Sequence, residues 1–189
     1  GPASQDGLTA KEMTEDQSAA SLKHVINMLT AMQKYPAQGG PEIMEMEKYW
    51  HPHFNWYGPS GIGSSRGIES FKSCHQTPFL DAMPDRGQYP DDVSLHIFAE
   101  GNYVAVTGWP NMAQTLSGQG WLGIAPTGQK ITLRSLDFWR LENGLIRENW
   151  VLVDLLDMWK QTGVDVIARM QQLTAASPHF PAQNAREAS

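Results

Sequence analysis

The 189-residue chain has little cysteine, no long apolar run and no excess of positive charge. Its single cysteine, Cys74, excludes an internal disulfide and a metal cage built from several thiolates. No apolar stretch reaches the roughly 18 residues that a transmembrane helix needs, so we expect no membrane partner. The 14 Lys and Arg residues are scattered and are outnumbered by 20 Asp and Glu residues, so we expect no nucleic-acid partner either.

The length suits one folded domain with a substantial core, and a hydrophobic share of 41% is ordinary for a globular protein. We expect a single domain over residues 15–176, preceded by a flexible N-terminus or cleavage remnant at 1–14 and followed by an extended or disordered tail at 177–189. The first residues contain neither a basic leader nor an apolar core, which predicts a cytoplasmic location.

The hydrophobic pattern changes from helical to strand-like along the chain. Helical spacing predicts helices over residues 15–35, 41–50 and 68–80. From Asp92 onward, Gly, Asn and Pro separate five strand-like runs: VSLHIFAE, YVAVTGWP, QGWLGIAP, KITLRSLDFWRLE and LIRENWVLVD. Helical spacing returns after Asp154. Helices followed by hairpin-connected strands predict an α+β domain, with the helices on one face of a curved antiparallel sheet and a cavity between the two layers.

The turn at residues 141–145 determines which side chains share a face of the last two strands. A three-residue loop would place Asp137 opposite Asn149, whereas a two-residue Asn-Gly loop would place it opposite Trp150. We favour the first, because it groups Ser135, Asp137, Asn149 and Val151 on one face.

Asp137 is the first candidate for chemistry, because a carboxylate lies here in the middle of an apolar strand. In an apolar pocket its pKa would rise toward the range of a general acid or base. Alternatively, it pairs with Arg134 or Arg140, or points to solvent. Asn149 would orient this carboxylate or bind a developing enolate oxygen; as a polar residue on the outer face it would do neither.

Other polar residues have structural interpretations that compete with functional ones. Asp154 is expected to cap the following helix, with a role as a pocket acid as the second interpretation. Cys74 and His75 do not form a dyad, because neighbouring helical residues point about 100° apart, and we expect a buried, inert thiol. His51 and His53 form an HxH pair, which on a regular strand could hold a metal; because Pro52 disturbs the strand, we expect no metal there.

No motif indicates a cofactor. The segment GPSGIGSSRG has neither the spacing nor the βαβ context of a dinucleotide-binding loop, and no serine occupies a GxSxG elbow. Seven tryptophans are spread over most of the predicted elements, which suits an aromatic-walled cavity for a flat, hydrophobic carbonyl ligand.

Two segments, EKYWHPHFNWYGPSGIGSSRGIESF and PTGQKITLRSLDFWRLENGLIRENWVLVDLLDMWKQTG, make the chain similar to the SnoaL-like polyketide cyclases over residues 18–163. The resemblance implies the fold of nuclear transport factor 2 and ketosteroid isomerase: a cone-shaped, strongly bent antiparallel sheet, with N-terminal helices packed over its concave face. It also implies an enclosed pocket, homodimers or homotetramers formed through the outer sheet faces, and no metal or organic cofactor.

In this family an acid/base carboxylate inside the cone serves the intramolecular aldol closure of a polyketide ring. The resemblance matches the position of that catalytic aspartate to Val151, and the position of the family's pocket histidine to Asp137. Either the carboxylate has moved between neighbouring strands or the cyclase chemistry is absent.

We therefore predict a cofactor-independent enzyme of the cyclase or isomerase type that transfers protons on a hydrophobic, polyketide-like carbonyl compound. Asp137 would be the acid/base and Asn149 its partner. Substrate contacts are predicted at five further positions: His53, Trp56, His75, Trp150 and Val151. One alternative is a non-catalytic module of the same fold that binds a small ligand or dimerises. A second is a dehydratase or hydrolase that pairs Asp137 with a histidine, either His53 or His75.

Overall fold

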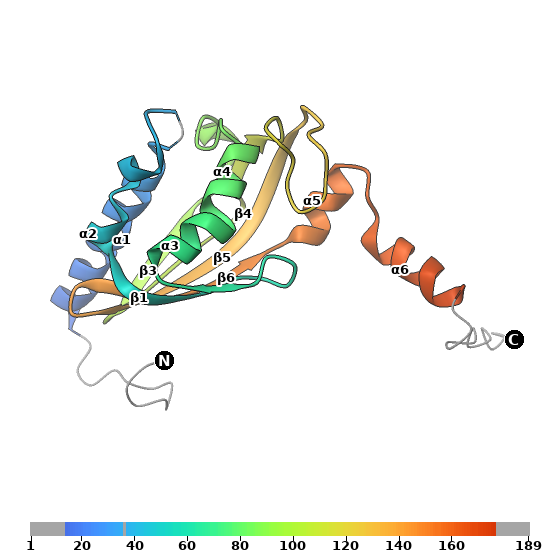
Figure 1. Cartoon of the computed structure of the whole chain (residues 1–189). Helices are drawn as coiled ribbons and strands as arrows, with labels where there is room; N and C mark the ends of the chain where they lie inside the picture. The colour runs from blue at the N-terminus through green and yellow to red at the C-terminus, as the bar shows by residue number, and fades with distance from the viewer. Residues whose placement is uncertain (1–13, 36, 177–189) are drawn as a thin grey trace, which may run out of the picture.

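The computed structural model describes residues 14–35 and 37–176 (Figure 1). The tails expected at 1–14 and 177–189 lie outside the described residues, except for Thr14. Thr14 caps the first helix, because its hydroxyl accepts a hydrogen bond from the Gln17 N–H at 3.1 Å. Within the described ranges, no helix is both long and apolar enough to cross a membrane.

The first half of the domain is mostly helical, as the hydrophobic spacing predicts. Its elements are α1 (Glu15–Met32), the 3-10 turn η1 (Pro41–Met44), α2 (Met46–Tyr49), β1 (Trp50–Tyr57), β2 (Ser64–Arg66), α3 (Ile68–Phe71), the π-helical turn η2 (Lys72–Gln76) and α4 (Thr77–Ala82). The second half contains the 3-10 turn η3 (Pro90–Asp92), β3 (His96–Glu100), β4 (Tyr103–Thr115), β5 (Lys130–Glu142), β6 (Leu145–Val153), α5 (Leu155–Gln161) and α6 (Val166–Ala175).

Two predicted elements differ from the structure. The helix expected over residues 41–50 is broken at Glu45, whose φ of 50° is left-handed, and Trp50 already belongs to β1. The strand expected in QGWLGIAP is a loop with one isolated bridge, between Trp121 and Ile124. Leu122 lies in this loop at a φ of 50°, a conformation incompatible with a regular strand.

The six strands form one mixed sheet in the order β2-β1-β6-β5-β4-β3. β1 runs parallel to β6 and the other neighbours are antiparallel, so the fully antiparallel sheet that we expected is wrong. The parallel pair arises because β1 and β6 are far apart in the sequence and are not joined by a hairpin. Their register shifts between Trp50 and Asn55, where Pro52 lacks the N–H that a regular ladder requires.

Neither predicted register of the β5–β6 hairpin is correct. Asn143 and Gly144 form a two-residue loop with φ values of 51° and 76°, the left-handed pair of a type I′ turn. A further register shift between Arg140 and Leu141 then places Asp137 opposite Val151. Relative to the favoured prediction the strand has moved by two residues, which preserves the face to which each side chain points.

The helices α1, α3 and α4 lie over one face of the sheet (Figure 1), and the core fills the space between the two layers. α1 packs on β3 and β4, whereas α3 packs on β1 and β2. α5 packs on β5, and α6 extends away from the sheet without a buried residue (Figure 1). The α+β class is confirmed; the strongly bent cone that the resemblance implied stays an expectation.

Candidate active site

A cavity of about 350 Å³ lies between the helices and the inner face of the sheet. On this face α1 covers the edge formed by β3 and β4, and α3 covers the edge formed by β1 and β2, so residues of the central strands β5 and β6 are left to line the cavity. This volume is typical of a site for a small molecule. Much of its wall is apolar or aromatic and comes from both layers: Met28, Met32, Trp50, Trp56, Phe71, Phe79, Trp121 and Trp139.

Asp137 lies in the middle of β5 and lines this cavity. Burial raises the pKa of its carboxyl from 3.8 to about 6, while hydrogen bonds from Asn149 and Ser135 and the positive charge of Arg86 partly oppose this rise. A carboxyl group with this pKa can both accept and release a proton near neutral pH.

The competing interpretations of Asp137 do not fit its surroundings. Arg134 pairs with carboxylates after β6, at 3.6 Å from Asp154 and 3.5 Å from Asp157. Arg140 is buried and contacts Glu148 at 2.6 Å. Both arginines are therefore committed elsewhere, and Asp137 is not held in a salt bridge by either of them.

A chain of polar side chains orients the carboxylate. The Ser135 hydroxyl donates to Asp137 Oδ2 at 3.3 Å and accepts from Asn111 Nδ2 at 2.7 Å. Asn111 Oδ1 also accepts the Ser135 N–H at 2.9 Å. Asn111 lies where the β4–β5 register shifts, between Gly108 and Met112, so its amide there bonds the β5 backbone. No sequence pattern points to Asn111, because a bulge displaces it from regular alternation.

Asn149 lies on the same face as Asp137, although it is not directly opposite. Its Nδ2 donates to Asp137 Oδ1 at 3.5 Å and to the Phe138 carbonyl at 3.1 Å. Both N–H bonds of the amide are therefore engaged within the protein. This geometry favours the orienting role over the enolate-binding role that we also considered.

Arg86 also lines the cavity, and no sequence pattern pointed to it. It lies in the irregular loop after α4, and Asp85 anchors that loop by accepting the Thr115 N–H at 2.7 Å and the Tyr89 hydroxyl at 2.9 Å. Burial lowers the pKa of the Arg86 guanidinium, and the charge of Asp137 partly offsets this. Tertiary contacts bring Arg86 into the site, so local periodicity contains no signal for it.

His75 and Gln76 reach the cavity from the π-helical turn η2. Pro78 cannot donate to the carbonyl of Cys74, so a regular α-helical ladder cannot continue there. The His75 ring stacks on Trp56 with centroids 4.3 Å apart, and burial lowers its pKa from 6.5 to about 3. The imidazole is therefore neutral at physiological pH, and its Nδ1 and the Gln76 Oε1 have no hydrogen-bond partner among the described residues.

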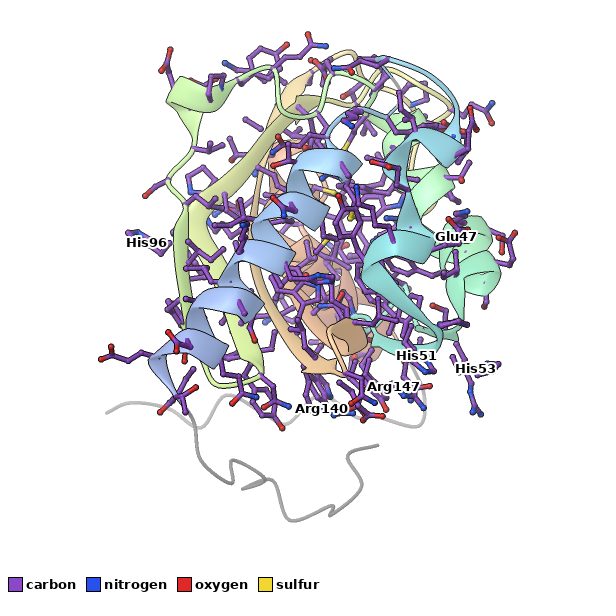
Figure 2. The ribbon with its side chains drawn as sticks, turned by 90° about the vertical axis from the view of Figure 1, so that its left-hand side faces the viewer. Glu47, His51, His53, His96, Arg140 and Arg147 are labelled. Atoms are coloured by element: carbon purple, nitrogen blue, oxygen red, sulfur yellow. The ribbon has the colours of Figure 1, made fainter. Side chains whose placement is uncertain are left out.

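The predicted substrate contacts divide into two groups. Trp56, His75 and Val151 line the cavity, whereas His53 and Trp150 do not. Strand alternation explains both corrections, because each neighbours a residue that points inward. His53 is exposed and projects away from the protein, as does His51 (Figure 2). Trp150 stacks instead on Tyr57 across the strand pair, with centroids 5.7 Å apart.

The remaining polar candidates have clear structural settings. Asp154 caps α5 by accepting the Asp157 N–H at 3.1 Å, as predicted. Cys74 is exposed, so the expected buried thiol is wrong. The rings of His51 and His53 are 5.9 Å apart, and the described part of the chain contains no group of three or more side chains that could hold a metal ion.

The histidine–aspartate pair of the dehydratase or hydrolase alternative is also missing. None of the histidines that the structure describes lies within hydrogen-bonding distance of Asp137. The side chains that contact this carboxylate are Ser135 and Asn149.

Helices over one face of a six-stranded mixed sheet, with a polar cluster in the cavity between them, place the protein in the NTF2-like class of α+β folds. Residues 29–162 match the family described as SnoaL-like polyketide cyclase, and the chain belongs to this family. A comparison with curated protein sequences gives no significant match.

Solved structures support the fold at low sequence identity. A proposed SnoaL-like polyketide cyclase from Jannaschia sp. CCS1 is 18% identical with a TM-score of 0.65, over 82% of this chain and 98% of that one. AclR, a proposed hydroxylase from Streptomyces galilaeus, is 19% identical with a TM-score of 0.57, over 77% and 97%. An NTF2-like protein from Burkholderia xenovorans LB400 is 13% identical with a TM-score of 0.51, over 76% and 95%.

Proposed function

We propose that the protein is a cofactor-independent enzyme of the cyclase or isomerase type, with Asp137 as the acid/base for a hydrophobic, polyketide-like carbonyl compound. The observation that carries this proposal is the position of Asp137: its carboxylate faces a largely apolar cavity, its pKa is raised to about 6, and neither Arg134 nor Arg140 neutralises it. Membership of the SnoaL-like family supports the same class of reaction.

In the proposed step, Asp137 removes a proton from the carbon next to a substrate carbonyl. The C–H electron pair forms a C=C bond, and the carbonyl oxygen takes the negative charge. Attack of this enolate carbon on a second carbonyl of the same molecule closes a ring, and Asp137 returns its proton to the new alkoxide. Return of the proton to a different carbon would instead give an isomerase.

Ser135 and Asn149 hold the two carboxylate oxygens at fixed positions, which reduces the reorganisation required during the transfer. Val151, directly opposite on β6, adds apolar surface beside the carboxylate. Both features serve a general base that must lose its solvation without becoming locked in an ion pair.

The test is the exchange of the α-protons of a flat aromatic ketone, α-tetralone, in deuterated buffer, followed by nuclear magnetic resonance. We expect the wild-type protein to accelerate the exchange and Asp137→Asn to lose about a hundredfold to ten-thousandfold of that acceleration. His53→Gln is the matched control, because His53 is exposed outside the cavity. Equal acceleration by the wild type and Asp137→Asn would contradict the proposed role of Asp137.

The second candidate is a non-catalytic ligand-binding module of the same fold. It is favoured by Val151, because the resemblance places the family's catalytic aspartate at this position. Saturable binding of α-tetralone to the wild type, without any acceleration of exchange, would support this candidate over the enzyme.

We also propose a homodimer or homotetramer formed through the outer face of the sheet. Paired residues form an apolar row across five strands there, in the order Phe98, Ala105, Phe138, Trp150 and Tyr57. Leu152, which is 58% exposed, lies on β6 beside this row. An apolar outer face of this kind is typical of an interaction surface.

Light scattering tests the assembly. We expect Leu152→Glu to shift the protein to the monomer, whereas Ile26→Glu on the helical layer, where the side chain is 44% exposed, leaves the mass unchanged. An unchanged mass for Leu152→Glu would contradict an interface at this face.

A further inference from the structure

Arg86 and Asp137 reach the same cavity from different layers of the fold. Asp137 belongs to β5, and Arg86 belongs to the loop after α4. Each affects the protonation of the other, yet Arg86 makes no direct ion pair or hydrogen bond through its side chain to any residue that the structure describes. The two opposite charges are therefore close enough to interact electrostatically, although their side chains do not form a direct ion pair.

An arginine in this position is costly unless something uses its charge. Burial disfavours the charged guanidinium, and no anion pairs with it directly. The nearest acidic neighbour in sequence, Asp85, is occupied by Thr115 and Tyr89. The N–H donors of Arg86 are consequently available to the cavity, and two N–H groups of a guanidinium can donate converging hydrogen bonds to the two lone pairs of one oxygen.

No other lining group described in the structure offers a comparable positive charge. Four titratable residues line the cavity: His75, Arg86, Tyr89 and Asp137. His75 is neutral because burial lowers its pKa to about 3, and the Tyr89 hydroxyl donates to Asp85 at 2.9 Å. Both N–H bonds of the Asn149 amide are engaged by Asp137 and the Phe138 carbonyl. Arg86 is thus the cationic donor that faces the ligand space.

We propose that Arg86 binds the substrate carbonyl oxygen and stabilises the negative charge that develops on it while Asp137 takes the proton. This inference rests on the proposed function and adds its substrate class: an enolisable ketone or β-dicarbonyl compound whose carbonyl oxygen lies toward Arg86 and whose α-carbon lies toward Asp137. Arg86 is then a catalytic residue that contacts the reacting atoms.

The charge balance explains why the pair is kept apart. Before the transfer, the Asp137 carboxylate compensates the Arg86 guanidinium. When the α-C–H bond breaks, the proton neutralises Asp137, the electron pair forms the C=C bond, and the carbonyl oxygen becomes the anion. The negative charge has then moved from the sheet to the ligand, and Arg86 stays compensated throughout. A direct Arg86–Asp137 ion pair would stabilise the carboxylate of Asp137 instead of the negative charge on the substrate oxygen.

The test uses an oxyanion probe, para-nitrophenol, whose absorption distinguishes the phenol from the phenolate. It is measured in the Asp137→Asn background, because asparagine mimics the protonated carboxyl that accompanies the enolate. We expect this variant to lower the pKa of the bound probe by about one unit or more, a tenfold preference for the anion. Adding Arg86→Met should remove this shift, whereas adding Arg66→Gln, the loss of an exposed charge on β2, should preserve it.

Methionine is chosen because it keeps much of the side-chain volume and leaves no charge to be desolvated, so the fold is expected to survive. If Arg86→Met does not fold, Arg86→Gln is measured in its place. Equal probe pKa values with and without Arg86 would overturn the proposal.

A second arm uses para-nitrobenzoate, which is a permanent carboxylate. If the benzoate binds the wild type through Arg86 while the phenolate shows no Arg86-dependent shift, Arg86 recognises a carboxylate on the ligand and the oxyanion role is refuted. The probe requires no turnover, so it gives a result independent of the α-tetralone exchange that tests Asp137. A lost exchange effect with an intact probe shift refutes only the role of Asp137 as a base.

Discussion

Replacing Asp137 by Asn should stabilise the folded protein at neutral pH and much less in acid. The folded-state pKa of Asp137 is raised from 3.8 to about 6 because burial disfavours the carboxylate. Below pH 3.8 the group is protonated in both the folded and unfolded states, so it has no effect on stability. As the pH rises toward 6, the unfolded chain ionises first and the folded state loses stability; above that pH the loss is constant.

The size of the loss follows from the two pKa values. A difference of about two units corresponds to about 3 kcal/mol near pH 8 and about 1 kcal/mol near pH 4.5. Asparagine also rearranges the hydrogen bonds to Ser135 and Asn149, but this contribution does not depend on pH. The stabilisation by Asp137→Asn should therefore be larger near pH 8 than near pH 4.5 by about 2 kcal/mol.

Urea unfolding of the wild type and Asp137→Asn at the two pH values measures this difference directly. Asp91→Asn is the matched control, because Asp91 is exposed on η3, and its effect on unfolding should be small. A pH-independent effect of Asp137→Asn would show that the cavity does not raise the pKa of this carboxyl, and the acid/base assignment would lose its physical basis.

Three further changes follow from the same site. Arg86→Met should raise the pKa of Asp137 above about 6, because the guanidinium lowers it, and the pH midpoint of α-tetralone exchange should move upward; an unchanged midpoint would contradict the coupling. His75→Phe should keep the stacking on Trp56. Because the wild type loses stability as the pH falls from 6.5 toward 3, this variant should be more stable than the wild type by about 2 kcal/mol near pH 5 and equally stable near pH 8, as measured by urea unfolding. The double variant Asp137→Val/Val151→Asp should recover part of the α-proton exchange activity that Asp137→Asn loses. Activity as low as that of Asp137→Asn would show that the carboxylate is required on β5.

Regular elements were the most predictable part of the fold. α1 and the strands β3 to β6 are long enough for the spacing of their apolar residues to distinguish helix from strand. The face shared by Asp137 and Asn149 was also predictable, because side chains alternate with a period of two. Their register was not, because the shift between Arg140 and Leu141 adds a displacement that the turn sequence does not contain.

The residues that complete the site were beyond sequence reasoning for related reasons. Arg86 lies in a loop held by the contact of Asp85 with Thr115, and Asn111 lies at a bulge. Neither position follows the periodic spacing of a regular helix or strand, so the sequence could not assign either side chain to a face of the sheet. His53 was predicted to contact the substrate, yet alternation along β1 exposes it.

The pairing of Asp137 with Val151 shows how the carboxylate and the position that the resemblance matches to the family's acid are related in space. Directly opposed residues on antiparallel strands have Cβ atoms about 5 Å apart, so a carboxylate on either strand would reach the same part of the cavity. At the β5 position, Ser135 donates to a carboxylate oxygen and is itself held by Asn111. A second carboxylate at 151 would disfavour ionisation of the first, whereas valine supplies apolar contact. We therefore expect an apolar residue at 151 to let Asp137 titrate as a single group, and a carboxylate at 137 and valine at 151 to depend on each other.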